Sequence, residues 1–517
     1  MMSSSTEIIT TKTVSLFFGA GAEISYGLPS GGKFALDIFK MDTAEDKKKF
    51  RSDREKINKK SSYAKNWLPF DFEKKPISSF GKSQYESLVK SSLEYKRFEI
   101  IKYLNSFDEK SSKLADKIQR KYNINISSVF EEVTEIPFGS ETYGHEIKIS
   151  TTLGDYNNLF LSNYFSSFLK LLEPDKTPTS ITLKRQIKNF CRAVLELLIG
   201  ACGEDLINNL NDGIFEKKPD EIDIFDDLGG IFSLDYRGAG LTGLELLLNR
   251  EKNEINSESS NESVINYFAF EILEDIFSAC LDYQSLIDSN WRYLYSPKTD
   301  WAKFCRISIF LNTTRRYISG IAEKHSSEII KSNGFYHDIE QIKKTNEILA
   351  IGTTNYNEFI KSISKENIYF LNGSVNDFYD PYLNTTQSII ESEEGSHFTV
   401  PFLFTQSGIK PLTSIKMSKR YVDLYEQLKL SDSIAIVGYG FNSDDGHING
   451  MFRSLIEEDN KLITIFHYTD NFSTDSELTL KNHYQERLRL KTSDNLKIIK
   501  INSLRENEEG QIWHSCF

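Results

Sequence analysis

Small residues follow the first apolar run of the sequence. Val14 to Phe18 leads directly into Gly19-Ala20-Gly21-Ala22, and apolar residues return at helical spacing over Lys33 to Lys40. Residues without bulk let backbone N–H groups approach a pyrophosphate near the positive end of a helix. The spacing predicts a strand, a tight turn that binds a dinucleotide, and a helix. A turn that needs small residues for packing alone is the alternative, because Ile24 replaces the third glycine of G-x-G-x-x-G.

Polar side chains follow later apolar runs of strand length. Such a position suits ligand binding, because the carboxyl ends of strands in an open parallel sheet face the ligand crevice. Three segments follow such runs: Gly352-Thr353-Thr354-Asn355-Tyr356-Asn357, Leu371-Asn372-Gly373-Ser374, and Val437 to Asn449. A second loop of small residues lies early in the chain, at Tyr26-Gly27-Leu28-Pro29-Ser30-Gly31-Gly32.

These segments resemble the sirtuin-like family. Its opening turn reads G-A-G-A/I-S and is followed by a G-[IL]-P-S loop, and Ser25 supplies the serine here. The 352–357 segment resembles T-[TQ]-N-x-D, and the 371–374 segment resembles L-H-G-S. Residues 437–449 resemble the G-[YF]-[SG]-F-x-x-D-D-x-[HV]-[IL]-N segment of bacterial sirtuin-like defence proteins. Pro401 to Phe404 and Lys410-Pro411 are similar to further family elements.

The resemblance implies that NAD is bound as a substrate. No metal is expected, because the cysteines lack the C-x-x-C spacing of a zinc module. Asn355 corresponds to the residue that positions the nicotinamide ribose and an attacking water, although a helix-capping asparagine fits the same position. The residues expected to contact NAD are Gly19, Ala20, Gly21, Ala22, Ser25, Pro29, Ser30, Thr354, Asn357, Gly438, Gly440, Phe441, Asp444 and Asp445.

Two positions depart from the family motifs. Asn372 stands where the family carries its catalytic histidine, and an amide does not accept a proton at neutral pH. Asn357 stands where an aspartate is usual, so hydrogen bonding is kept and a charge is lost. His447 is the only histidine inside a matching motif and is a candidate replacement base; a helix cap or a partner of a neighbouring aspartate is its other interpretation.

The order of apolar runs predicts an α/β fold with a Rossmann-like, mostly parallel sheet, interrupted by a large and mainly helical insertion. The expected domains are a discontinuous NAD-binding domain at 13–40 plus 345–505, and a helical interaction domain at 41–344. Within the insertion, Glu135 to Leu153 suggests a small hairpin, and Glu251 to Glu262 a mobile loop.

Composition narrows the classes of partner. The 517 residues carry a formal charge of −12, which argues against general binding of nucleic acid or anionic lipid. Five cysteines without C-x-x-C spacing indicate neither a disulfide framework nor a zinc ribbon. The start of the chain shows no signal-peptide core, and no stretch reaches the ~20 apolar residues of a membrane helix. We expect a cytoplasmic protein that does not enter a membrane.

The expected function is NAD+ glycohydrolysis to nicotinamide and ADP-ribose, because the deacetylase histidine and four-cysteine zinc module are both missing. The resemblance implies NAD depletion in anti-phage defence by abortive infection. Such an activity must be restrained, so we expect a homo-oligomer or a protein partner, such as a hexameric translocase ATPase or a short Argonaute. An inactive sensor or scaffold that binds NAD or ADP-ribose, and a purely structural subunit, are the competing interpretations.

Overall fold

A computed structural model describes residues 12–28, 31–143, 158–173, 179–211, 221–223, 233–235, 240–250, 255–331, 333–403, 414–469 and 471–516. The chain divides into two compact units. One unit comprises the described residues within Met1–Phe34, Met41–Ser79 and Ile287–Phe517. The other comprises those within Ala35–Lys40 and Phe80–Leu286. The insertion expected at 41–344 is therefore shared between both units.

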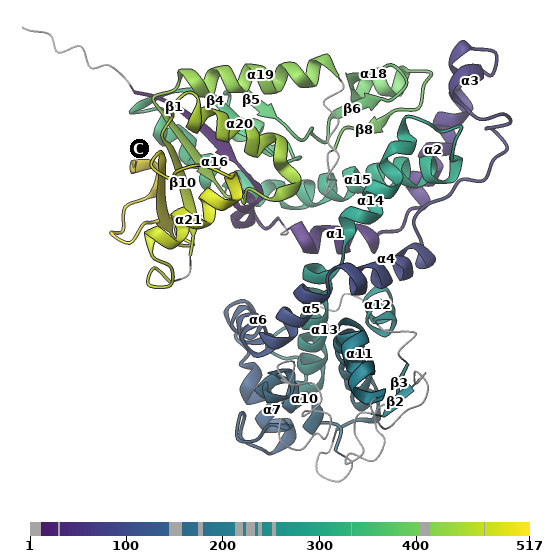
Figure 1. Ribbon diagram of the computed structural model, residues 1–517, viewed down its shortest axis with the longest axis vertical. Helices are drawn as coiled ribbons and strands as arrows, with labels where there is room; N and C mark the ends of the chain where they lie inside the picture. Colours follow the sequence, from purple (N-terminus) through teal and green to yellow (C-terminus); the bar gives the residue numbers. More distant parts are fainter. Residues whose placement is uncertain are drawn as a thin grey trace, which may run out of the picture. The chain divides into compact units, whose positions relative to one another are not determined.

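A six-stranded sheet forms the centre of the first unit (Figure 1). Every neighbouring pair of its strands is parallel. Numbered by their order along the chain, the strands read 3-2-1-4-5-6 across the sheet, which is the order of doubly wound Rossmann-like sheets. From one edge to the other they are β5 (Ile368–Phe370), β4 (Asn346–Thr353), β1 (Lys12–Phe18), β9 (Ser433–Val437), β10 (Ile463–Tyr468) and β11 (Leu496–Ile501). The expected mixed α/β fold with a mostly parallel sheet is confirmed.

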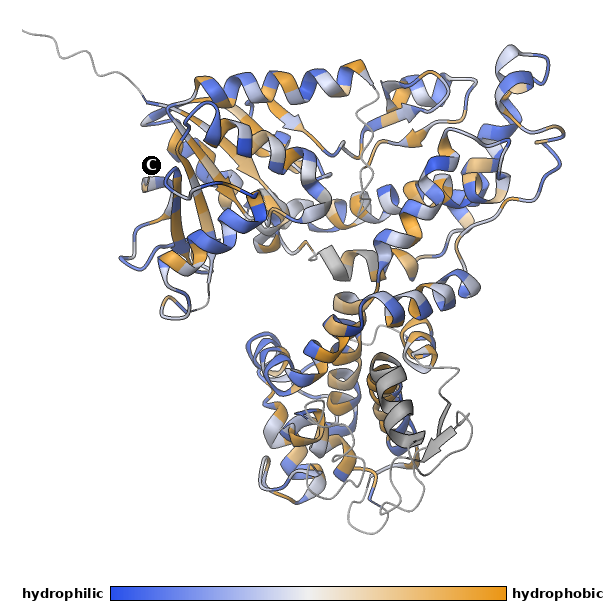
Figure 2. Ribbon diagram, viewed as in Figure 1, coloured by the Kyte–Doolittle hydropathy of each residue, from blue (hydrophilic) through white to orange (hydrophobic). Residues whose placement is uncertain are grey.

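Both faces of the sheet are covered, which explains why its strands are apolar along most of their length. In β1, Leu16 and Phe18 join a buried cluster with Tyr336 of α16 (Phe335–Ile342). Phe17 points to the other face, where its ring lies 4.9 Å from that of Phe452 in α20 (Gly446–Glu457). Figure 2 shows the strands mostly in the hydrophobic colour, whereas α19 (Ile415–Leu430) and α20 alternate between the two colours.

The first unit contains further elements. A small antiparallel sheet in the order β7-β6-β8, which the sequence analysis did not anticipate, is formed by β6 (Asp377–Asp380), β7 (Thr385–Ser388) and β8 (Val400–Pro401). Its remaining helices are η1 (Ala20–Tyr26), α2 (Ala44–Lys56), α3 (Ser62–Trp67), η6 (Arg292–Leu294), α15 (Trp301–Lys331), α17 (Phe359–Ile363), α18 (Ile389–Glu394), η7 (Ser443–Asp445), α21 (Glu477–Leu488) and η8 (Trp513–Ser515).

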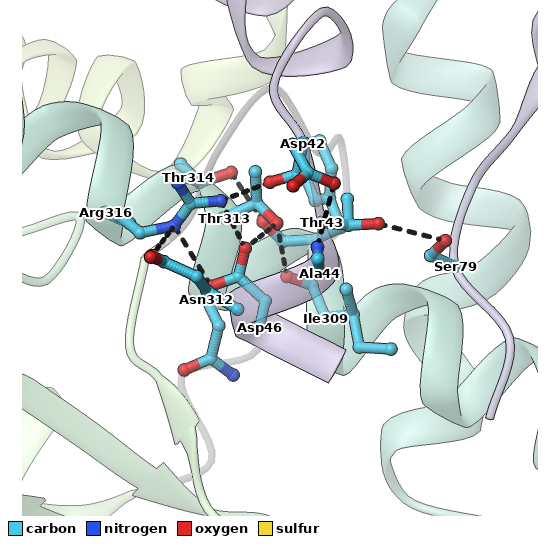
Figure 3. Close-up of polar contacts among 12 residues, drawn as sticks. Asp42, Thr43, Ala44, Asp46, Ser79, Ile309, Asn312, Thr313, Thr314 and Arg316 are labelled. Carbon is cyan, nitrogen blue, oxygen red and sulfur yellow. Dashed lines mark hydrogen bonds and ion pairs between the residues drawn. The ribbon is translucent and has the colours of Figure 1, made fainter. Parts of the chain in front are cut away.

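A partly buried ion pair attaches α2 to α15 within this unit (Figure 3). Arg316 Nη2 lies 2.7 Å from Asp46 Oδ2, and Thr313 donates its hydroxyl hydrogen to the same carboxylate at 2.7 Å. Arg316 also donates to the carbonyl oxygen of Asp42. Asp46 is 5% exposed, so the arginine and threonine compensate for the lost hydration of its carboxylate. These contacts explain why Met41–Ser79 belongs to the sheet-bearing unit.

The second unit is mainly helical, as the sequence predicts for this section. Its helices are α4 (Lys82–Tyr95), α5 (Arg97–Asn105), α6 (Phe107–Tyr122), α7 (Ile126–Thr134), α9 (Asn158–Leu161), α10 (Asn163–Lys170), α11 (Ile181–Asn211), α12 (Leu241–Leu248) and α13 (Asn261–Cys280). Phe130, Phe168 and Phe268 form an aromatic core between α7, α10 and α13. The helices α1 (Gly31–Phe39) and α14 (Tyr283–Trp291) each span a boundary between the units.

Two expectations for the second unit concern short segments. The described part of the hairpin expected at Glu135 to Leu153, residues 135–143, contains turns and no strand, and the rest lies outside the described residues. Instead, β2 (Glu221–Asp223) pairs with β3 (Ser233–Asp235). Within Glu251 to Glu262, residues 255–260 form a turn and α13 begins at Asn261; residues 251–254 lie outside the described part.

Candidate functional site

The turn after β1 lies directly against the turn after β9. Gly19 N–H donates to the Val437 carbonyl oxygen at 2.9 Å, and Gly21 N–H donates to the Gly438 carbonyl oxygen at 2.8 Å. The strand order reverses at β1, between β4 on one side and β9 on the other. This is the switch point at which doubly wound sheets bind their ligands. The glycines that the sequence selected from two distant segments therefore meet at the expected place.

The contact between these turns requires glycine on both sides. Gly438 has a φ of +67°, and a Cβ atom there would lie 2.2 Å from the backbone nitrogen of Ala22. A Cβ atom on Gly19 would lie 2.4 Å from the carbonyl oxygen of Gly438. Gly21 N–H and Ala22 N–H are both used inside the protein, the latter by the Gly19 carbonyl oxygen at 3.0 Å. In this conformation Gly19 and Gly438 allow the two turns to pack closely. The backbone amides of Gly21 and Ala22 do not face a phosphate.

The segment after β4 lies on the other side of the β1 turn. Thr354 N–H donates to the Phe18 carbonyl oxygen at 3.2 Å, and Asn355 Nδ2 donates to the Gly19 carbonyl oxygen at 3.0 Å. Nδ2 also donates to the hydroxyl oxygen of Tyr336 at 3.0 Å. Both amide hydrogens of Asn355 are thereby used, and its Oδ1 is the polar atom that remains to contact a ligand.

The segment after β5 lies beside the segment after β4. Leu371 N–H donates to the Thr353 carbonyl oxygen at 2.9 Å. The next residue, Asn372, is 4% exposed. Asn372 Oδ1 and Asn357 Oδ1 are buried and have no hydrogen-bond partner among the described residues. An unpaired buried acceptor costs roughly 1–3 kcal/mol, which a ligand that donates a hydrogen bond would recover. Asn357 and Asn372, the two positions that depart from the resembled motifs, therefore each carry an unpaired oxygen in addition to Asn355 Oδ1.

Tyr421 of α19 contacts both the segment after β5 and the segment after β9. Its hydroxyl group donates to the Leu371 carbonyl oxygen at 2.9 Å, and its ring centroid lies 5.4 Å from that of His447. The negative charge of Asp445 contributes to raising the pKa of Tyr421, after the larger effect of burial. His447, Asp445 and the Asn372 segment therefore share one neighbour, which the sequence analysis missed because a helical tyrosine carries no motif.

Glu23 is the second residue that the sequence analysis missed. It lies in η1, is 5% exposed, and accepts from the Tyr336 hydroxyl group at 2.7 Å and from Asn357 Nδ2 at 2.5 Å. Burial raises the pKa of its carboxyl group to about 8, although the hydrogen bonds from Tyr336, Asn357 and Asn355 act in the opposite direction. Near neutral pH, Glu23 therefore holds its proton.

The remaining predicted residues lie in varied surroundings. Ala20, Ser25 and Gly440 are exposed, and the ring of Phe441 is buried against Tyr439, Phe452 and Tyr484. The Gly440 carbonyl oxygen accepts from Arg487 Nη1. Asp444 lies in η7. Pro29, Ser30, Phe404, Lys410 and Pro411 lie outside the described residues.

Within the described ranges, no group of three or more His, Cys, Asp or Glu side chains is placed to hold a metal ion. Among the helices of the same residues, none combines the length and the apolar character that a bilayer crossing requires.

Comparison with protein-family models, with curated proteins and with solved structures gave no match for this chain.

Proposed function

We propose that this protein is a sirtuin-like NAD+ glycohydrolase that cleaves NAD+ to nicotinamide and ADP-ribose. The observation that carries the proposal is the meeting of the segments after β1, β4, β5 and β9 at the switch point of a doubly wound sheet. At its centre, the Asn355 amide is held by the Gly19 carbonyl oxygen. The family resemblance of the same segments supports the choice of NAD+ as the ligand.

The reaction needs little acid–base catalysis by the protein. The bond between ribose C1′ and the nicotinamide nitrogen breaks, and nicotinamide leaves as a neutral molecule with the bonding electrons. Water adds to the oxocarbenium-like C1′ and releases a proton to solvent. The protein must hold the ribose, orient the water and stabilise positive charge. Asn355 Oδ1, fixed by the two bonds of Nδ2, is suited to accept a hydrogen bond from the water or a ribose hydroxyl group.

The first test is the hydrolysis of a fluorogenic NAD analogue by Asn355→Ala. We expect a loss of at least about 100-fold in kcat/KM, the effect typical of removing one preorganised polar group at a reacting centre. Asn367→Ala is the matched control, because Asn367 is exposed and precedes β5 at the opposite end of the sheet. Thermal unfolding of both variants verifies that they are folded. Equal activity of Asn355→Ala and the wild type would contradict the proposal.

A sensor or scaffold that binds NAD or ADP-ribose without cleaving it is the second candidate. The absence of a titratable base at Asn372 favours it, since an amide cannot take a proton from the attacking water. The same assay separates the two functions. Measurable binding of NAD with no hydrolysis, in the isolated protein and in the presence of the products of neighbouring genes, would support the sensor.

We also propose that the activity depletes NAD in anti-phage defence and is controlled by self-association or by a partner protein. Large apolar side chains on helices of the second unit support a protein contact. Tyr95 and Phe98 are each 76% exposed, and Ile181 is 89% exposed. Exposed apolar side chains that lie together in a patch are typical of interaction surfaces.

A further inference from the structure

The segment that follows β11, residues 502–516, packs into the core of the sheet although no motif marks it. Trp513 is fully buried, and its ring centroid lies 6.4 Å from that of Phe18 in β1 and 5.3 Å from that of Phe335 in α16. The segment folds back on itself, because Trp513 N–H donates to the Arg505 carbonyl oxygen at 2.8 Å. This end of the chain therefore shares one core with β1 and α16.

The same segment binds the carboxylate of Asp338 in α16. Arg505 Nε donates to Asp338 Oδ2 at 2.8 Å, and Trp513 Nε1 donates to the same oxygen at 2.7 Å. Arg505 Nη2 also donates to Asn333 Oδ1 at 3.0 Å, just ahead of the helix. Asp338 is 5% exposed, and a carboxylate buried to this degree needs its charged and neutral donors in place. These bonds fix α16 against the segment.

The first turn of α16 is also held by η1. Tyr336 N–H donates to the Tyr26 hydroxyl oxygen at 3.0 Å, and the two tyrosine rings stack with their centroids 5.4 Å apart. His337 Nδ1 lies 3.1 Å from the same hydroxyl oxygen. Tyr336 is thus placed by η1 and, through the helix that it shares with Asp338, by the segment after β11.

The Tyr336 hydroxyl group is the contribution of α16 to the candidate site. It accepts from Asn355 Nδ2 at 3.0 Å and donates to Glu23 Oε1 at 2.7 Å. The second amide hydrogen of Asn355 is bound by the Gly19 carbonyl oxygen. The direction of Asn355 Oδ1 therefore depends on where α16 places the hydroxyl group. A displacement of about 1 Å at such a group can lower a rate by about 100-fold.

We propose that Asp338, Arg505 and Trp513 are positioning residues for the hydrolysis of NAD+. Through α16, they hold the Tyr336 hydroxyl group where it orients the Asn355 amide. The assignment rests on the proposed function, since it concerns the same Asn355. The segment after β11 is thereby part of the candidate site, although it follows the last strand of the sheet.

The test is a double-mutant cycle on the hydrolysis of the fluorogenic NAD analogue. Trp513→Phe keeps an aromatic ring in the core and removes the N–H group that binds Asp338. We expect its kcat to fall at least about 5-fold while KM changes by less than about 2-fold. Tyr336→Phe should lower kcat by at least about 10-fold, the effect of one lost hydrogen bond. Because Trp513 acts through the Tyr336 hydroxyl group, the double variant should lose no more kcat than Tyr336→Phe alone.

Trp301→Phe is the matched control. The Trp301 indole N–H group donates to the Pro76 carbonyl oxygen at 3.0 Å, and the side chain is also buried. The substitution therefore removes a hydrogen bond of the same kind at a place that does not contact α16 or the candidate site. It should leave kcat at the wild-type value. Thermal unfolding of every variant verifies that it is folded.

Two outcomes would overturn the assignment. One is a folded Trp513→Phe with the wild-type kcat, and the other is a double variant in which the two losses multiply, because Trp513 would then support stability without orienting Asn355. Should Trp513→Phe fail to fold, Arg505→Lys keeps the charge beside Asp338, removes the forked contact, and enters the same cycle. A wild type that never hydrolyses NAD would instead refute the proposed function, and this inference with it.

Discussion

At the scale of single residues, Glu23 links the candidate site to the stability of the protein. Its carboxyl group has a pKa of about 8 in the folded protein and an ordinary value of 4.5, and burial is the main cause of the difference. The folded state therefore binds a proton that the unfolded state has already lost between these two pH values. The stability that the protonated Glu23 side chain contributes is fully present below pH 4.5, and it is lost as the pH rises through 8.

This linkage predicts different pH dependences for the wild type and Glu23→Gln. The variant keeps a neutral group at all pH values, so its stability relative to the wild type should increase with pH. The increase should reach up to about 1.4 kcal/mol per pH unit between pH 4.5 and 8, and then level off. Thermal unfolding of both proteins from pH 5 to 9 measures the effect. Parallel curves would show that Glu23 is not held neutral.

Asn355 and Asn357 could be predicted from the sequence as site residues, whereas Glu23 could not. Asn355 and Asn357 were selected from their position after an apolar run, and the structure brings both to the β1 turn. Glu23 was not selected, because a carboxylate in a turn of small residues is ordinarily solvent-exposed. Its burial depends on Tyr336, which lies 313 residues away in the sequence. A contact of that kind has no local signal.

At the scale of secondary-structure elements, the turns after β1 and β9 meet so closely that neither Gly19 nor Gly438 has room for a side chain. We expect Gly438→Ala to destabilise the protein by about 2 kcal/mol or more, because the new methyl group would overlap the Ala22 nitrogen and the backbone has a positive φ. NAD binding should weaken in parallel, since the turns must separate. Chemical denaturation and competition against labelled ADP-ribose measure the two effects.

Gly320→Ala provides the control for this substitution. Gly320 lies inside α15, is exposed, and a Cβ atom there would meet nothing within 4 Å. Alanine is the better helix former, so this variant should be as stable as the wild type or more so by up to about 1 kcal/mol. A similar loss of stability in both variants would show that the turn contact is not special.

The elements themselves were predictable to different degrees. Each of the six strands of the main sheet coincides with an apolar run in the sequence and could be located from it, because strands buried on both faces are almost continuously apolar. The small sheet was missed, since β6 begins and ends with aspartate and Thr385–Ser388 is polar throughout. Sequence spacing also gave no indication that Gly21 and Ala22 would use their amides internally.

At the scale of the whole molecule, we expect the protein to associate with itself or with a partner. Size-exclusion chromatography with light scattering should give a mass that is a multiple of 59.5 kDa, or a larger complex when neighbouring gene products are present. Replacing Tyr95 and Phe98 by serine should weaken the association if their exposed rings take part. A single monomeric species under every condition would contradict the expectation.

The position of β1 has a consequence for biosynthesis. It pairs with β4 on one side and β9 on the other, and the contact between Phe18 and Thr353 spans 335 residues. A ribosome that adds roughly 5–20 residues per second needs about 20 to 70 s to complete that interval. The apolar amino-terminal segment must therefore wait without its partners, while the intervening helices, whose contacts are more local, can fold first. Until β9 has been synthesised, the nascent chain exposes the future centre of its own sheet to aggregation and to chaperones.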